Sequence, residues 1–70
     1  MTLKDVYMSG IFDDNTEITL VISPKGTYKT ARGRWYEDKI QYLFIQYINA
    51  PIEVLDYHRK ENWLYIEVTA

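Results

Sequence analysis

The sequence contains no cysteine, a single histidine, two prolines and three glycines among its 70 residues. The absence of cysteine excludes a disulfide framework and any thiolate metal site, and it fits a reducing cytoplasm. No apolar run approaches the length of about 20 residues that a membrane-spanning helix needs. Lys4 and Asp5 interrupt the apolar residues at the start, so nothing there resembles a signal peptide. We therefore predict a cytoplasmic protein without membrane association.

Charge of one sign is also scarce, since the formal net charge is only −2. This value is too small for an acidic DNA mimic and gives no support for duplex nucleic acid as a partner. The hydrophobic fraction of 47% and the charged fraction of 26% are typical of a folded chain. We predict one domain over residues 1–70. A domain this small buries little of its surface, so oligomers often supplement it.

Aromatic residues, in contrast, are abundant, with seven tyrosines, two tryptophans and two phenylalanines. A small core cannot bury so many rings with every polar tip satisfied, so some of them are expected at the surface. Tyrosine and tryptophan are favoured in interfaces and ligand pockets. The composition therefore directs attention to aromatic surfaces.

The first half of the chain predicts a helix followed by two strands. Thr2 is a candidate cap for a short helix that Gly10 would end. Alternating apolar residues predict a strand over 16–23. Pro24-Lys25-Gly26 interrupts it, and a second extended run covers 27–35. Neither face of this second run is strongly apolar, so we expect an edge strand, or a strand whose outer face meets a ligand or partner.

The segment 37–49 has an ambiguous pattern. Ile40, Leu43, Phe44 and Tyr47 have the i, i+3, i+4, i+7 spacing of a helix. The run YLFIQYI is also rich in β-branched and aromatic residues, which are typical of a buried strand. We favour the helix on its periodicity and keep the strand as the alternative.

Residues 52–68 predict an antiparallel hairpin around which the fold is organised, with a turn at 59–62. Leu64, Ile66 and Val68 share one face of its second strand and form the clearest core signal. The predicted fold is α+β, with a four-stranded, mainly antiparallel sheet and two short helices on one face. The order of elements is α-β-β-α-β-β.

The most suggestive candidate site is a cluster of cationic and aromatic residues on the second strand: Lys29, Arg32, Arg34, Trp35 and Tyr36. Arginine pairs with phosphate or carboxylate through two hydrogen bonds, and aromatic rings stack on bases. We predict that this cluster binds a small anionic ligand. The alternative is an edge strand kept soluble by charge, with Trp35 folded over the core. Gly33, inside this cluster, predicts a bulge or a close backbone approach.

A second candidate surface consists of Trp63 and Tyr65, with Tyr57 from the neighbouring strand. These rings are predicted to share the outer face of the hairpin, which we expect to serve as an interface in a homo-oligomer.

No catalytic, metal or cofactor site is predicted. His58 follows Asp56 on one strand face but has no recognisable nucleophile, so we interpret it as a surface residue. The run from Asp13 to Glu17 lacks the spacing and glycine of an EF-hand, and turn chemistry explains it.

Four short patterns carry a resemblance: LKDV at 3–6, DDNTEI at 13–18, IEVLD at 52–56 and WLYIEV at 63–68. Together they resemble a group of small phage-encoded proteins of unknown function. Those proteins usually enter the first strand from a longer helix, which Gly10 interrupts here. The resemblance implies a phage or prophage origin, an α+β fold and a place in the host cell cytoplasm. It supplies no functional residues.

The functional hypothesis is a non-catalytic binding protein. Its leading form is a phage counter-defence protein that sequesters a small anionic ligand, such as a nucleotide signal. The alternative is an inhibitor of a host enzyme that acts through its aromatic sheet face or an edge strand. A third form is a structural accessory subunit of a phage.

Overall fold

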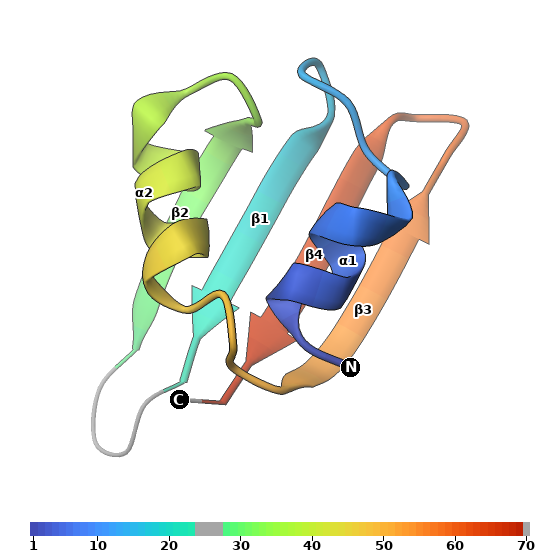
Figure 1. Cartoon of the computed structure of the whole chain (residues 1–70). Coiled ribbons are helices and arrows are strands. Elements are labelled where there is room, and N and C mark those ends of the chain that lie inside the picture. The colour runs from blue at the N-terminus through green and yellow to red at the C-terminus, as the bar shows by residue number, and fades with distance from the viewer. Residues whose placement is uncertain (24–27, 70) are drawn as a thin grey trace.

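The computed structural model describes residues 1–23 and 28–69, which form two helices and one four-stranded sheet (Figure 1). The elements are α1 (Leu3–Ser9), β1 (Glu17–Ile22), β2 (Lys29–Arg34), α2 (Asp38–Gln46), β3 (Ile52–His58) and β4 (Trp63–Val68). The α+β class and the α-β-β-α-β-β order are confirmed, and the ambiguous segment is helix α2. The turn predicted at 24–26 lies outside the described residues.

Helix α1 begins and ends where the sequence predicts. The Asp5 carboxylate accepts the Thr2 N–H at 2.8 Å, and the Asp5 N–H donates to the Thr2 hydroxyl at 3.4 Å, which is a reciprocal capping box. Gly10 ends the helix in the left-handed region with φ 69°, and its N–H donates to the Tyr7 carbonyl at 3.3 Å. Glycine adopts this conformation without steric strain, so the helix can stop here.

The strand order in the sheet is β2-β1-β4-β3, which leaves β2 and β3 at the edges. The edge position predicted for the second strand is therefore confirmed. Both hairpins, β1–β2 and β3–β4, are antiparallel, but the central pair β1–β4 is parallel. The sheet is thus mixed, because the two most apolar strands take the centre and α2 crosses over between the edge strands. Parallel neighbours require such a crossover connection.

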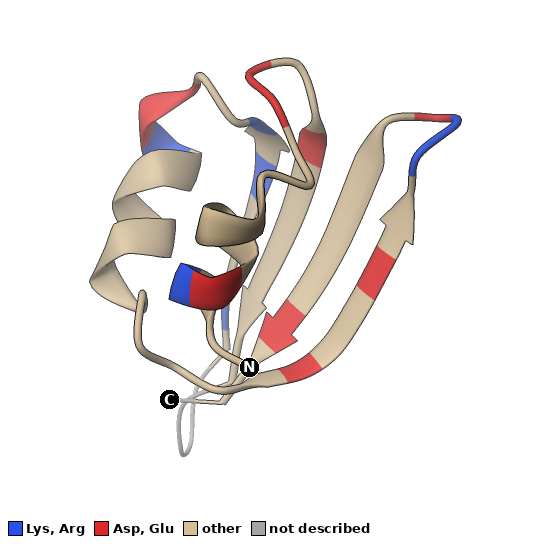
Figure 2. Ribbon diagram, turned by 45° about the vertical axis from the view of Figure 1, so that its right-hand side comes forward, with Lys and Arg blue, Asp and Glu red and all other residues tan. Residues whose placement is uncertain are grey.

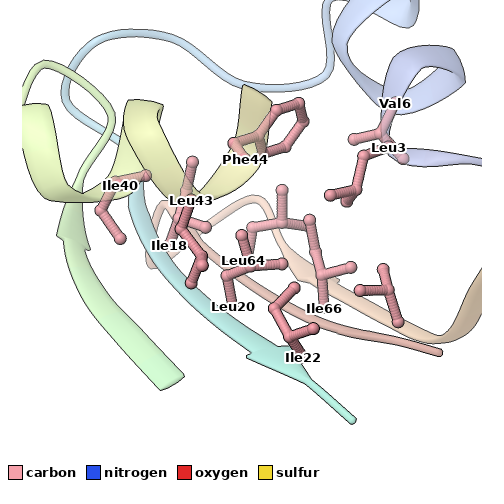
Figure 3. Close-up of a cluster of buried hydrophobic side chains, with 11 residues drawn as sticks. Leu3, Val6, Ile18, Leu20, Ile22, Ile40, Leu43, Phe44, Leu64 and Ile66 are labelled. Carbon is pink, nitrogen blue, oxygen red and sulfur yellow. The ribbon is translucent and has the colours of Figure 1, made fainter. Parts of the chain in front are cut away.

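The core lies between the sheet and the two helices (Figure 3). Ile18, Leu20 and Ile22 of β1 point to the same side as the buried residues of β4, as the alternation predicts. Helix α1 adds Leu3 and Val6. Helix α2 adds Ile40, Leu43 and Phe44. The helical periodicity of segment 37–49 outweighed its β-forming composition because α2 can bury its apolar side on one sheet face.

A polar contact joins the α1–β1 connection to the β3–β4 turn at one end of the sheet. Thr16 is fully buried; its hydroxyl accepts the Asp13 N–H at 3.0 Å and donates to Asn62 Oδ1 at 2.8 Å. Asn62 has φ 57°, a left-handed conformation that asparagine tolerates better than most residues. The two turns are therefore fixed relative to each other.

We expect acid to weaken the contact between these two turns, and so to lower the stability of the fold, because Asp13 becomes protonated. The Asn15 N–H donates to the Asp13 carboxylate at 2.9 Å and lowers the pKa of Asp13, and the Thr16 hydroxyl, 3.2 Å from it, acts in the same direction. A lowered pKa gives stability that is present above the unfolded-state pKa of about 3.9. It is lost as the pH falls through the folded-state pKa.

The measurement is urea unfolding at a series of acidic pH values. Asp13→Asn should remove part of the pH dependence below about pH 4. Asp14→Asn is the matched control, since the Asp14 side chain makes no hydrogen bond within residues 1–23 and 28–69. An equal loss of pH dependence in both variants would contradict the role of Asp13.

Candidate functional site

The sheet face opposite the helices, which we call the open face, presents three rows of side chains, and each row holds one residue from every strand. Strand registers give the rows Arg34, Glu17, Trp63, His58; Arg32, Thr19, Tyr65, Asp56; and Thr30, Val21, Glu67, Val54. They alternate with helix-facing residues, so they point away from α1 and α2. Within the described ranges, no helix or loop covers this face (Figure 1, Figure 2).

The open face has a shallow depression of about 480 Å³. Its lining consists of Glu17, Thr19, Arg32, Glu61, Trp63 and Tyr65. Arg32 Nη2 lies 2.7 Å from Glu17 Oε1, so its charge is already compensated within the chain. Glu61 adds a second carboxylate. The depression therefore carries no excess positive charge with which to attract an anion.

His58 is occupied by contacts within the β3–β4 hairpin. Its ring stacks on Trp63 at 3.7 Å between centroids with an interplanar angle of 14°, and its Nε2 lies 3.1 Å from Asp56 Oδ1. Cross-strand aromatic pairs of this kind stabilise a hairpin by about 0.2–1 kcal/mol. The neighbourhood of His58 is explained by hairpin packing.

Tyr65, at the centre of the open face, is tied to its own strand. Its hydroxyl donates to Glu67 Oε2 at 3.0 Å. This hydrogen bond, together with partial desolvation and the negative charge of Glu67, raises the pKa of the Tyr65 hydroxyl. The Tyr65 ring is thereby held in place, and the Glu67 carboxylate has a partner on the sheet.

The outer surface of the two helices, which we call the helix layer, carries exposed apolar side chains. Tyr42 and Met8 are each 73% exposed, Ile45 64% and Tyr7 52%. The charged residues of both helices lie in their first turns, at Lys4, Asp5, Asp38 and Lys39, and the remaining turns are uncharged (Figure 2). These exposed apolar side chains make the helix layer a candidate interaction surface.

A depression of about 420 Å³ lies within the helix layer, between α1 and α2. It is lined by Tyr7, Trp35, Gln41, Phe44, Ile45 and Ile48. Trp35 packs edge-on against Phe12 and Phe44, with ring centroids 4.9 and 5.0 Å apart. Gln41 donates its side-chain amide to the Trp35 carbonyl at 2.9 Å. The walls are thus aromatic and aliphatic, and they are held by packing rather than by charge.

The five residues predicted to bind an anion do not come together in one site. Lys29 points to the helix side, where its Nζ lies 3.0 Å from the Tyr47 hydroxyl. Arg32 and Arg34 lie on the open face, and Arg34 Nη1 donates to the Asn15 carbonyl at 2.8 Å. Trp35 packs on the helix side, as the alternative interpretation held. Tyr36 is exposed beyond the strand. Strand alternation separates the cluster, because neighbouring residues face opposite sides.

Gly33 marks a close approach rather than a bulge, since the β1–β2 register is regular there. A Cβ at this position would lie 2.6 Å from Glu37 Oε2. The same oxygen accepts the Arg34 N–H at 2.7 Å. Gly33 therefore lets the Glu37 carboxylate fold back over the end of β2, where α2 begins.

The predicted aromatic row on the hairpin is correct for Trp63 and Tyr65 but wrong for Tyr57. His58 pairs with Trp63 across the turn, so Tyr57 pairs with Leu64 on the helix-facing side. The four-residue turn at 59–62 already contained this information, because it makes residues 58 and 63 neighbours. The role of these three residues in an interface stays a prediction.

The acidic cluster at Asp13–Glu17 is a turn, as its sequence predicts. The Asp13 carboxylate is occupied by hydrogen bonds within the turn, and Glu17 pairs with Arg32. In residues 1–23 and 28–69, no group of three or more histidine and carboxylate side chains is placed to hold a metal ion. Nor does either described helix have the length and apolarity to cross a membrane.

The sequence-based interpretation did not assign a role to the helix layer. Its signal was nevertheless present, since α2 has no charged residue after Lys39 and carries Tyr42 and Ile45 one turn apart on its outer side. Comparisons of the chain with protein-family models, curated protein sequences and solved structures gave no match. The resemblance to small phage-encoded proteins therefore stays a prediction.

Proposed function

We propose that the protein is a non-catalytic binding domain whose helix layer holds an apolar segment of another protein. The observation that carries this proposal is the depression between α1 and α2, which the exposed apolar residues Tyr7 and Ile45 line and which has no charged residue in its lining. Tyr42 adjoins Ile45 on the outer side of α2. Soluble domains of this size rarely leave so many large apolar side chains exposed together unless they serve an interaction.

The chemistry of the lining defines the partner. Tyr7 and Trp35 offer aromatic walls, and Ile45 and Ile48 offer aliphatic ones. A partner would place two or three apolar side chains there, as the apolar side of an amphipathic helix does. Aromatic residues in such grooves supply most of the binding energy. Because no charged residue lines the depression, binding should depend little on salt.

The leading hypothesis from the sequence, sequestration of a small anion, loses support because its five residues lie on different sides of the sheet. The alternative, an inhibitor that binds a host enzyme, is also a protein-binding domain. The sequence predicted that it would act through the sheet face or an edge strand, whereas the surface proposed here is the helix layer. A phage origin and a counter-defence role would be compatible with such a domain and rest on the resemblance alone.

Selection of peptides from a displayed random library on the immobilised protein tests the proposal. We expect the selected peptides to be amphipathic and to carry aromatic or aliphatic anchors. Ile45→Asp should weaken their binding by about tenfold or more, because it places an uncompensated charge beside apolar contacts.

Tyr28→Asp is the matched control. Tyr28 is also an exposed aromatic residue, 77% accessible, but it does not line the depression. Peptide binding to this variant should be unchanged. If no peptide is enriched, or if the two variants bind the peptides equally, the helix layer is not the binding surface.

A further inference from the structure

The open face is polarised from one edge to the other. Arg32 and Arg34 project from the edge strand β2, while Asp56 projects from the opposite edge strand β3. In Figure 2 the basic residues of β2 and the acidic residues of β3 lie at opposite edges of the sheet. Between the two edges stand the rings of Trp63 and Tyr65. A surface with one basic edge and one acidic edge can be complementary to itself.

We propose that the open face is covered by the open face of a second copy of the chain, related by a two-fold axis parallel to the strands. This rotation lays β2 of each copy over β3 of the other and β1 over β4. In the second row, Arg32 of one copy, which also pairs with Glu17 of its own chain, then faces Asp56 of the other copy, and the reverse contact is equivalent. Two sheets packed in this aligned way form a sandwich with a separation of about 10 Å.

Two facing sheets can also be related by a two-fold axis perpendicular to the strands, and the charge pattern favours the parallel axis over that one. An axis perpendicular to the strands would lay β2 over β2 and β3 over β3. Because Arg32 and Asp56 lie in the middle row, each would then face its own copy. Like charges in such positions repel, so this arrangement is disfavoured.

The inner strands are compatible with being covered. The two carboxylates that they project to the open face already have partners within the chain, Glu17 with Arg32 and Glu67 with the Tyr65 hydroxyl. A paired carboxylate costs less to remove from water than an isolated one. Thr19 and Val21 bring no charge, and the Trp63 and Tyr65 rings supply apolar area of the kind that interface centres contain.

The size of the face sets the strength of association. Four strands with a spacing of about 4.8 Å and about six residues with a rise of about 3.3 Å give a face of roughly 400 Å². Two such faces cover roughly 800 Å² in total, which is below the range of about 1,200–2,000 Å² for specific, stable interfaces and typical of weak, transient ones. We therefore expect a weak, reversible dimer that forms only at high protein concentration. In such a dimer the two helix layers point outward, so each copy keeps its proposed binding surface free.

Sedimentation over a wide range of protein concentration measures the association. The wild-type chain should pass from monomer to dimer. Asp56→Arg should weaken dimerisation by about tenfold or more, because it brings Arg32 of the second copy against a like charge. Asp56→Glu should dimerise like the wild type, since it keeps a carboxylate opposite Arg32 and leaves the Arg32–Glu17 pair intact.

Asp14→Arg is the matched control, because it makes the same change of net charge in an exposed turn outside the open face. It should dimerise like the wild type. Circular dichroism and thermal melting establish that each variant is folded. A wild-type chain that stays monomeric at all concentrations overturns the proposal. A dimer that tolerates Asp56→Arg, or that is lost equally in Asp56→Glu, overturns the geometry.

This inference does not depend on the proposed function. Peptide binding is tested at Ile45 on the helix layer, and dimerisation is tested at Asp56 on the open face. The two positions lie on opposite sides of the sheet, so failure of either experiment leaves the other interpretable.

Discussion

Replacing Phe44 by alanine should lower the free energy of unfolding by about 3–5 kcal/mol. Phe44 has no exposed surface and stands where the helix layer meets the core. The rings of Trp35 and Phe12 lie 5.0 and 6.0 Å from it, and that of Tyr7 lies at 6.5 Å. Its removal leaves a cavity and deprives three neighbours of contacts. A domain this small has a total stability of only about 4–10 kcal/mol, so the variant should be partly unfolded at room temperature.

Urea unfolding followed by tryptophan fluorescence and circular dichroism measures this loss. Tyr42→Ala on the same helix is the control, because Tyr42 is 73% exposed and its truncation should change stability by less than about 0.5 kcal/mol. A similar loss in both variants would show that helix propensity, rather than burial of the Phe44 ring, accounts for the effect.

Ile66→Ala should cost about 2–5 kcal/mol. Ile66 is fully buried in the central strand β4, and the strand registers place Leu20 of β1 and Leu55 of β3 on either side of it. The two helices cover it, so the cavity cannot be filled by solvent or by a simple shift of an edge. The same urea titration gives the value.

Leu55→Ala is the comparison for this second prediction. Leu55 faces the same side of the sheet as Ile66 but lies on the edge strand and is 38% exposed. Its truncation should cost distinctly less, because part of its surface already contacts water. Equal losses in the two variants would contradict the central position of β4.

The hairpin at residues 52–68 shows how far a pattern can be interpreted without the structure. Its period-two alternation identified Leu64, Ile66 and Val68 as core residues, and all three are buried. The prediction for Tyr57 was wrong, because the turn pairs His58 with Trp63 and so puts Tyr57 opposite Leu64, on the helix-facing side. A bulge between Ile52 and Val54 further shifts that strand, and no residue type in the sequence signals it.

The cluster from Lys29 to Tyr36 illustrates a different limit. Its residue types suit an anion site, but a strand divides consecutive residues between two faces, and the contacts of each face are made by distant segments. Glu17, which is 15 residues from Arg32 in the sequence, neutralises the charge of Arg32. The Tyr47 hydroxyl accepts a hydrogen bond from Lys29 Nζ. Such long-range partners decide whether a charge is available to a ligand, and local patterns do not contain them.

By itself, the sequence determined the elements of this protein. Capping residues, alternation and helical spacing are local properties, so the helix beginning after Thr2, the core strands and the edge character of β2 follow from neighbours in the chain. Only the tertiary structure decided that β1 and β4 pair in parallel, that the rows of the open face bring Arg32 and Asp56 to opposite edges, and that Tyr7 of α1 lines one apolar depression together with residues of α2. These features arise from packing between segments far apart in the chain, where the geometry of the whole sheet fixes which side chains become neighbours.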